Sequence, residues 1–439
     1  MKLQRIIFSL FFMLNVNSTF ADIDLLYCID SALQENSELR KARAEFLAFE
    51  ESENQSFANL LPSVGLSISR SKVNQDRSDG TGLSLNQEYV MESDSLSVRQ
   101  PVYRPKLLKD LRKIKKEISA EKLLLSNREN IFKMKVIEVY FRLLRAYAEE
   151  SLLEKRISLL LEQKKAATKS ITAGVGTITE LAEINAANDR AAVDLIRAKQ
   201  NIRLELNELQ FYIGEKISQV KMLNGGKKSF DSFGSYPINY WEEQAVAQNY
   251  ELKSKKNRID AARIGLAAEK FNRYPTLDLN IQISRGSSES TFFVDSETKS
   301  SSVGLTFYLP LYQGGGVSSR IRQSASSLDA EVQGLRLQEE DLRKKVQKSY
   351  FNLLESIELR TALRSAITSS MIELEATKRS TSAGVRKQLD VLISQQKALG
   401  VEREFVDTKL NIFLYWLNLN MFTSTLDRAT IKKVNDFLH

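Results

Sequence analysis

Two long stretches without proline and almost without glycine place the strongest constraint on the fold of this chain. No proline or glycine lies between Lys106 and Ala173, and the stretch from Val317 to Ala383 contains only Gly334. Because both residues disfavour a helix interior, each stretch predicts one helix of about 68 residues, roughly 100 Å long. No single globular core surrounds rods of this length. We therefore expect them to pack side by side as coiled coils.

The two stretches belong to an internal duplication with a nearly constant offset. The segment Val136-x-x-x-Tyr140-Phe141 recurs 210 residues later as Val346-x-x-x-Tyr350-Phe351, and Ala173-Gly174-Val175 recurs at the same offset as Ala383-Gly384-Val385. A match that holds its register over so much of the chain indicates two tandem copies of one structural unit.

Each repeat is predicted to contain a helix, two strands and a long helical hairpin. The first repeat covers 22–225, with strands at about 63–100 and the hairpin at about 106–214. The second covers 238–425, with strands at about 276–310 and the hairpin at about 317–420. The remaining segments are a linker at 226–237 and a C-terminal tail at 426–439.

The predicted strands alternate apolar and polar residues with period two. In the clearest case, Leu277, Leu279 and Ile281 share one face, while Asp278 and Asn280 share the other. Runs of about ten such residues match the strands of a transmembrane β-barrel. Four strands are too few to close a barrel, and an open edge in lipid leaves backbone groups unpaired. We therefore expect an α+β membrane protein that must oligomerise.

The N-terminus predicts export from the cytoplasm. Lys2 and Arg5 precede an apolar run at 6–16, and Ala21 follows it, which indicates a signal peptide at 1–21. The alternative, an N-terminal membrane helix, requires a longer apolar run. Cys28 follows a faint lipoprotein-like box, but the bulky Tyr27 before it argues against lipidation.

Composition excludes several classes of function. The 63 basic and 55 acidic residues are interspersed, so no basic stripe indicates nucleic-acid binding. One cysteine rules out an internal disulfide, and a single histidine, His439, rules out His-based catalysis and most zinc sites. We predict no catalytic residue, metal or cofactor, since an enzyme would need a mechanism that uses carboxylates alone.

Prolines and glycines mark the predicted corners between helices and strands. Proline cannot continue a helix interior or a central strand, so the prolines near predicted element ends are interpreted as corners. The glycines at 314–316 lack the Gly-Lys-Ser/Thr ending of a phosphate-binding loop, so they also predict a sharp corner. The predicted corner residues are Pro62, Pro101, Pro105, Pro275, Pro310, Gly314 and Gly315.

These features together resemble the TolC family of outer-membrane efflux channels. The resemblance rests on the signal peptide, the tandem repeats, the segment Leu-Pro-Leu-Tyr-Gln-Gly-Gly-Gly at 309–316 and the paired Ala-Gly-Val motifs, and it extends from about 22 to 422. It implies a homotrimer with a 12-stranded barrel in the outer membrane of a Gram-negative bacterium, continued by a helical barrel across the periplasm. It further implies an adaptor protein and an inner-membrane RND or ABC transporter as partners. The sequence leaves the cargo open, whether drug or protein.

The resemblance also assigns roles to residues near the Ala-Gly-Val motifs. It places Gly174, Val175, Gly176, Gly384 and Val385 at hairpin tips that contact the adaptor. It places Glu180, Glu183 and Asp390 at the periplasmic entrance, where rings of acids would select cations. Arg386 would act as a latch on Glu180 of a neighbouring hairpin, although an ordinary i,i+4 pair with Asp390 is the alternative. Ile393 replaces a second acid, so a double acidic ring is in doubt.

One alternative of a different class remains, a periplasmic coiled-coil adaptor or scaffold. Such a protein would carry a lipoyl-like β domain and a membrane anchor, and neither is visible in the sequence.

Overall fold

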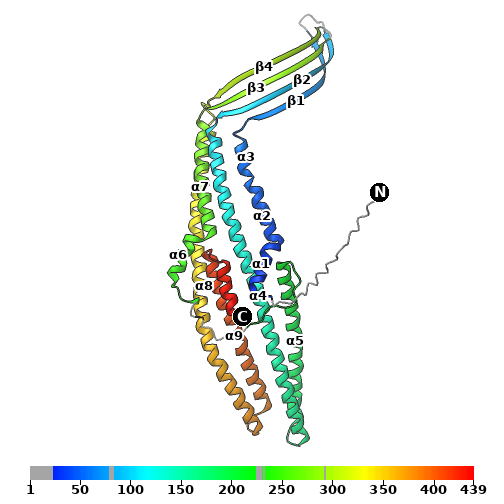
Figure 1. Cartoon of the computed structure of the whole chain (residues 1–439), viewed down its shortest axis with the longest axis vertical. Coiled ribbons are helices and arrows are strands. Elements are labelled where there is room, and N and C mark those ends of the chain that lie inside the picture. The colour runs from blue at the N-terminus through cyan, green and yellow to red at the C-terminus, as the bar shows by residue number, and fades with distance from the viewer. Residues whose placement is uncertain (1–22, 79–83, 224–229, 231–232, 291–292) are drawn as a thin grey trace, which may run out of the picture.

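The chain forms an elongated molecule with a β-sheet at one end and two helical hairpins at the other (Figure 1). The computed structural model describes residues 23–78, 84–223, 230, 233–290 and 293–439. The signal peptide predicted at 1–21 lies outside the described residues, as does half of the predicted linker.

The two repeats contain corresponding sets of helices. In the first repeat these are α1 (Leu25–Glu35), α2 (Ser37–Glu50), α3 (Ser52–Ala58), α4 (Pro105–Thr172) and α5 (Ile178–Ile213). In the second they are α6 (Ile238–Gln248), α7 (Tyr250–Lys270), the short 3-10 helix η2 (Phe271–Arg273), α8 (Gly316–Ser382) and α9 (Gln388–Phe422). The first hairpin consists of α4 and α5, and the second consists of α8 and α9.

The longest helices follow the two stretches that lack proline. α4 has 68 residues and begins with Pro105 at its first position, where a missing backbone N–H costs nothing. α8 has 67 residues and continues through Gly334, as predicted for one uninterrupted helix. A single glycine costs a helix only about 1 kcal/mol, which the packing of so long a rod offsets.

The helix predicted before the strands is broken in both repeats at an asparagine. Asn36 ends α1 and begins α2, and its side chain accepts hydrogen bonds from the N–H groups of Glu38 (2.8 Å) and Leu39 (3.4 Å). Asn249 does the same between α6 and α7. Asparagine is among the best N-cap residues, so each break is encoded locally.

The strands form one antiparallel sheet in the order β1-β2-β3-β4. They are β1 (Ser63–Ser78), β2 (Ser84–Tyr103), β3 (Thr276–Ser290) and β4 (Phe293–Tyr308). With 15 to 20 residues each, the strands exceed the length of about ten that the alternation predicts. The extra length is polar, and cross-strand ion pairs such as Arg70–Glu92 and Arg285–Glu297 sustain the pairing there.

The main core lies midway along the molecule, where α1, α4, α5, α9 and the C-terminal helix at 428–438 meet. The segment predicted as a C-terminal tail is instead the helix α10 (Arg428–Leu438). Its apolar face buries Ile431, Val434 and Leu438, and Phe437 packs edge-on against Phe233. The strong helical periodicity of these apolar residues was available in the sequence and indicates this docked helix.

Candidate functional site

The tip of the first hairpin is a tight helix ending centred on Gly174. Its φ of +75° is left-handed, its N–H donates to the Ile171 carbonyl (2.9 Å), and the Val175 N–H donates to the Ser170 carbonyl (3.0 Å). This pattern is a Schellman motif, in which glycine adopts the left-handed conformation at little cost. Thr177 then caps α5 by accepting from the Glu180 N–H at 3.2 Å.

The tip of the second hairpin repeats this geometry. Gly384 has φ of +76°, and Val385 donates to the Ser380 carbonyl at 2.9 Å. Two positions of the turn differ, because Arg386 stands where the first tip has Gly176, and Lys387 stands where it has Thr177. A Cβ atom at Gly176 would lie 2.8 Å from a backbone nitrogen, so the first tip requires glycine there and the second tip does not.

Both tips expose apolar side chains to solvent. Val175 is 81% exposed and Val385 is 79% exposed, and Ile178 beside the first tip is exposed to a similar degree. The tips form the end of the molecule farthest from the sheet (Figure 1).

The charged residues expected at the entrance have no ion-pair partner within the described part of the chain. Arg386 donates to the Thr377 hydroxyl at 3.4 Å rather than to Asp390. Asp390 accepts from the Lys387 N–H (3.2 Å) and so supports the start of α9. Glu180 and Glu183 lie on α5, partly exposed, and the structure does not bring Arg386 into contact with either. The i,i+4 pair that was the alternative is therefore not formed.

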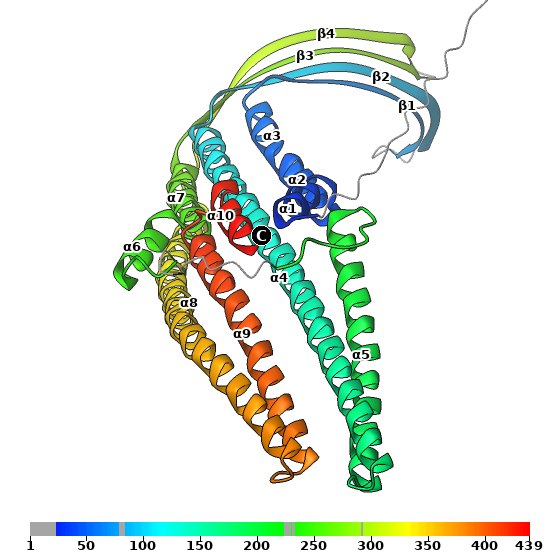
Figure 2. The same ribbon diagram turned by 60° about the horizontal axis from the view of Figure 1, so that its bottom comes forward.

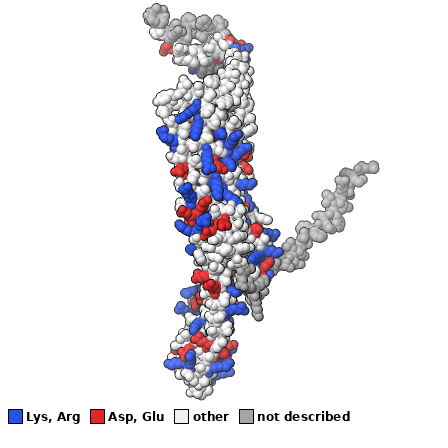
Figure 3. Space-filling view, turned by 90° about the vertical axis from the view of Figure 1, so that its left-hand side faces the viewer, with Lys and Arg blue, Asp and Glu red and all other residues white. Residues whose placement is uncertain are grey.

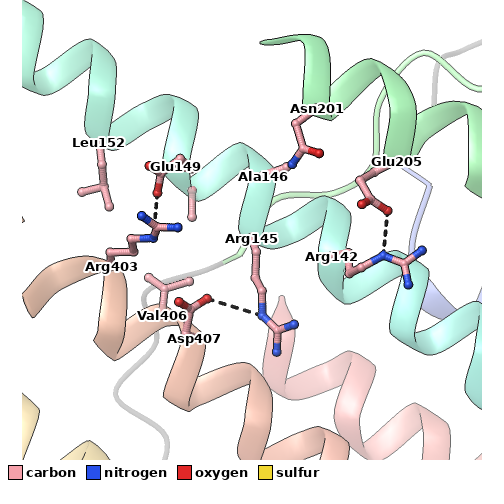
Figure 4. Close-up of a pocket in the computed structure, with 11 residues that line it drawn as sticks. Arg142, Arg145, Ala146, Glu149, Leu152, Asn201, Glu205, Arg403, Val406 and Asp407 are labelled. Atoms are coloured by element: carbon pink, nitrogen blue, oxygen red, sulfur yellow. Dashed lines mark hydrogen bonds and ion pairs between the residues drawn. The ribbon is translucent and has the colours of Figure 1, made fainter. Parts of the chain in front are cut away.

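Side-chain contacts link the two hairpins between their tips and the core. Gln163 on α4 donates to Gln395 on α9 at 3.2 Å, and Lys155 pairs with Glu402 at 2.9 Å. A crevice of about 270 Å³ lies nearer the core, between α4, α5 and α9. Figure 4 shows the residues that line it. There Arg403 pairs with Glu149 at 3.0 Å. These contacts escaped prediction because each joins residues more than two hundred positions apart.

The predicted corner residues occupy the junction between sheet and helices, with one correction. Pro62 and Pro275 immediately precede β1 and β3, Pro310 follows β4, and Gly314 and Gly315 have positive φ before α8. Pro101 does not form a corner, because it lies inside β2. It stands at a shift in register between β2 and β3, where a bulge tolerates proline.

A buried acid at this junction was missed by the sequence analysis. Asp278 accepts from Arg104 at 2.8 and 2.5 Å and from Arg99 at 2.9 Å. Its side chain is 8% exposed, whereas that of Arg99 is 55% exposed. The alternation placed Asp278 on the polar face of β3 but gave no signal of its two partners in β2 and just beyond it.

In the part of the sheet nearer the helices, one face is apolar, while farther out the same face carries ion pairs such as Arg285–Glu297. The opposite face is lined mainly by hydroxyl and amide groups. The register of the strands brings the residues of the apolar face together on one side of the sheet. They are Val64, Leu66, Ile68, Leu96, Val98, Leu279, Ile281, Ile283, Val303, Leu305 and Phe307. The other face, here called the hydroxyl face, includes Ser63, Ser67, Ser69, Ser71, Ser93, Ser95, Ser97, Asn280, Gln282, Ser284, Ser300, Ser302 and Thr306, with Arg99 and Asp278 at its helix end. Most residues of the apolar face are exposed in the single chain.

Other kinds of site are not found in the part of the chain that the structure describes. No group of three or more potential metal ligands occurs among the described residues. In the same residues, no helix is long and apolar enough to cross a membrane. Basic and acidic side chains are interspersed along the helical body on the face that Figure 3 shows.

Solved outer-membrane channels share this architecture. The crystal structure of the CmeC outer-membrane channel of Campylobacter jejuni superposes with a TM-score of 0.76 at 18% identity, over 96% of this chain and 91% of that one. The family described as outer membrane efflux protein matches residues 28–215 and 241–420, which fall within the two repeats. The chain belongs to this family, and the resemblance drawn from its sequence is confirmed.

Relatives with known roles align over nearly the whole chain. Outer membrane protein TolC of Escherichia coli is 24% identical over 94% of this chain and 85% of its own length. The alkaline protease secretion protein AprF of Pseudomonas aeruginosa is 24% identical over 99% of this chain and 91% of its own. The chain is therefore a protein of the Gram-negative outer membrane that extends into the periplasm.

Proposed function

We propose that three copies of this chain close into a channel that exports substrates across the periplasm and the outer membrane. The observation that carries this proposal is the pair of open edges of the sheet, since β1 and β4 each pair on one side only. An open edge cannot remain in lipid, because its backbone groups find no partners there. Joining β4 of one copy to β1 of the next closes a 12-stranded barrel.

Exposed apolar stripes on the hairpins support the same closure. On α5, Ile196, Leu204 and Phe211 are exposed and recur at intervals of eight and seven residues. On α8, Leu337 and Phe351 are exposed fourteen residues apart. Such spacings are typical of a coiled-coil seam, so α5 of one copy packs against α8 of the next.

The two faces of the sheet determine its orientation in this channel. The apolar face meets lipid, and the hydroxyl face lines the lumen, as in other barrels with polar interiors. The channel has no chemistry of its own. The exposed valines at the tips dock a periplasmic adaptor, which connects the channel to an inner-membrane transporter of the RND or ABC class.

The periplasmic entrance is held closed by Arg386. This residue and Glu180 are both without an ion-pair partner in the described chain, which suits a contact between neighbouring copies. Glu183 and Asp390 add negative charge around the same entrance.

Single-channel conductance in planar bilayers tests the channel. We expect a small conductance, because the entrance rests closed. Leu305→Asp should abolish insertion because it places a charge in lipid, whereas the adjacent Thr306→Asp, on the hydroxyl face, should still insert. Equal behaviour of the two variants, or a purified protein with no conductance, would contradict the proposal.

The latch has a separate test in the same assay. Neutralising Arg386 (Arg386→Gln) should raise the conductance severalfold, and Glu180→Gln should act in the same direction. The matched control is Arg379→Gln, because Arg379 pairs with Glu375 at 3.3 Å on its own helix. An unchanged conductance in Arg386→Gln would contradict the proposal that Arg386 holds the entrance closed.

A further inference from the structure

The hydroxyl face of the sheet carries almost no charge in the part that the structure describes. Away from the helices, this face runs from Ser97 back toward Leu85 on β2 and from Asn280 forward to Ser290 on β3. Its described side chains there are hydroxyl, amide, apolar or glycine. Several of them are bonded to each other, such as Ser284 to Ser300 at 2.7 Å and Asn280 to Thr306 at 3.0 Å. This surface therefore exerts little electrostatic selection.

A cluster of three charges lies at the helix end of this face. Arg99 pairs in register with Ser63 and Asn280, both on the hydroxyl face, so Arg99 belongs to that face. Asp278, two residues before Asn280, shares it. Arg104, just beyond β2, completes the cluster by donating hydrogen bonds to both carboxylate oxygens of Asp278.

The charges of this cluster do not cancel. One carboxylate faces two guanidinium groups, and Arg104 takes both of its oxygens, the bidentate arrangement that arginine favours. Arg99 bonds one of the same oxygens, and more than half of its side chain remains exposed. Each copy thus presents one net positive charge, on the more exposed arginine.

We propose that Arg99 forms an anion-attracting ring at the base of the barrel and selects for charge there. This inference rests on the proposed function, because only a closed trimer turns Arg99 into a ring. Three net positive charges in a narrow lumen draw in anionic groups and repel cationic ones, and rings of arginine serve anion pathways in this way. Cargo bearing carboxylate or phosphate groups is therefore favoured at this ring, whereas acids at the entrance favour cations.

Thiol reactivity beside the ring measures its potential directly. Ser97→Cys places a thiol on the hydroxyl face two residues from Arg99, and the native Cys28 is fully buried, with a raised thiol pKa because burial disfavours the thiolate. In a Cys28→Ala background, the rate constants of Ser97→Cys are measured with two methanethiosulfonate reagents. One carries a sulfonate and the other a trimethylammonium group.

We expect the sulfonate reagent to react in preference to the trimethylammonium reagent. Adding Arg99→Gln should lower the ratio of the sulfonate rate constant to the trimethylammonium rate constant by roughly two- to fivefold at about 0.1 M salt. The matched control is Arg285→Gln, which removes an arginine from the other side of the same sheet and should leave the ratio unchanged. A ratio unaffected by Arg99→Gln, or changed equally by Arg285→Gln, would overturn the inference.

A lipid-side cysteine separates this failure from failure of the proposed function. In membranes, Leu66→Cys on the apolar face should resist both charged reagents, while Ser97→Cys reacts. If Leu66→Cys reacts and Ser97→Cys does not, the sheet is not oriented as proposed and both proposals fail. If the sheet is oriented as proposed but Arg99→Gln leaves the ratio of rate constants unchanged, only the proposal of the anion-attracting ring is wrong.

Discussion

Among single residues, His439 makes contacts that depend on pH. Its Nδ1 lies 3.1 Å from the Met222 carbonyl, and its Nε2 lies 3.3 Å from the Tyr140 hydroxyl. A neutral ring can donate to the first and accept from the second. Burial lowers the pKa of His439 below its ordinary value of 6.5, because the charged ring loses hydration.

This shift predicts acid destabilisation of the α10 contact. A depressed pKa means that the unfolded chain binds the proton more tightly. The contribution of His439 is therefore complete above the ordinary pKa of about 6.5 and is lost as pH falls from there through the lower pKa of the folded state. The free energy of unfolding should fall with a slope of at most about 1.4 kcal/mol per pH unit between pH 7 and 5, and His439→Gln should flatten it. Urea unfolding followed by tryptophan fluorescence measures the slope. An equal slope in the variant would contradict this account.

Residues whose role is local were predictable, and residues whose role depends on distant partners were not. Gly174 and Gly384 were assigned to hairpin tips because a left-handed helix ending is a property of the chain at that point. Asp278 could not be assigned, since its partners Arg99 and Arg104 lie 179 and 174 positions away. Alternation predicts the face of a strand residue but not the side chains that the neighbouring strand brings to it.

At the scale of elements, the two asparagine breaks allow an internal comparison. Each caps a helix, but Asn249 also donates to the Phe422 carbonyl at 2.9 Å, a bond that has no counterpart at Asn36 among the described residues. Asn36→Ala should cost about 1 kcal/mol, the usual cost of a lost N-cap, and Asn249→Ala should cost about 2 kcal/mol. Thermal unfolding followed by circular dichroism measures both. Asp at either site keeps the capping oxygen and is the matched control, and a larger loss at Asn36 would refute the comparison.

The lengths of the two longest helices were predicted closely, and the lengths of the strands were not. α4 and α8 match the proline-free stretches almost to the residue, because nothing in them competes with a helix. The strands were predicted too short, since their outer parts pair through charged side chains such as Lys72 and Glu88 rather than through apolar ones. The helix α10 was read as a tail because it lies outside both repeats, although its own periodicity indicates a buried face.

At the scale of the whole molecule, the duplication explains the architecture. Two copies of one unit place two hairpins at one end and pair their four strands into one sheet at the other (Figure 2). The sequence predicted this arrangement because the offset between the repeats barely changes along the chain. What it could not supply is the set of contacts between the hairpins, such as Lys155–Glu402, which depend on how the repeats pack.

The central claim is that this chain completes its sheet and its helical barrel with two further copies of itself. Native mass spectrometry of the detergent-extracted protein tests this most directly, because it counts the chains in each particle. The account predicts three chains per particle and no stable monomer, since β1 and β4 would otherwise remain open. A particle of one or two chains that withstands extraction with its sheet intact would contradict the account.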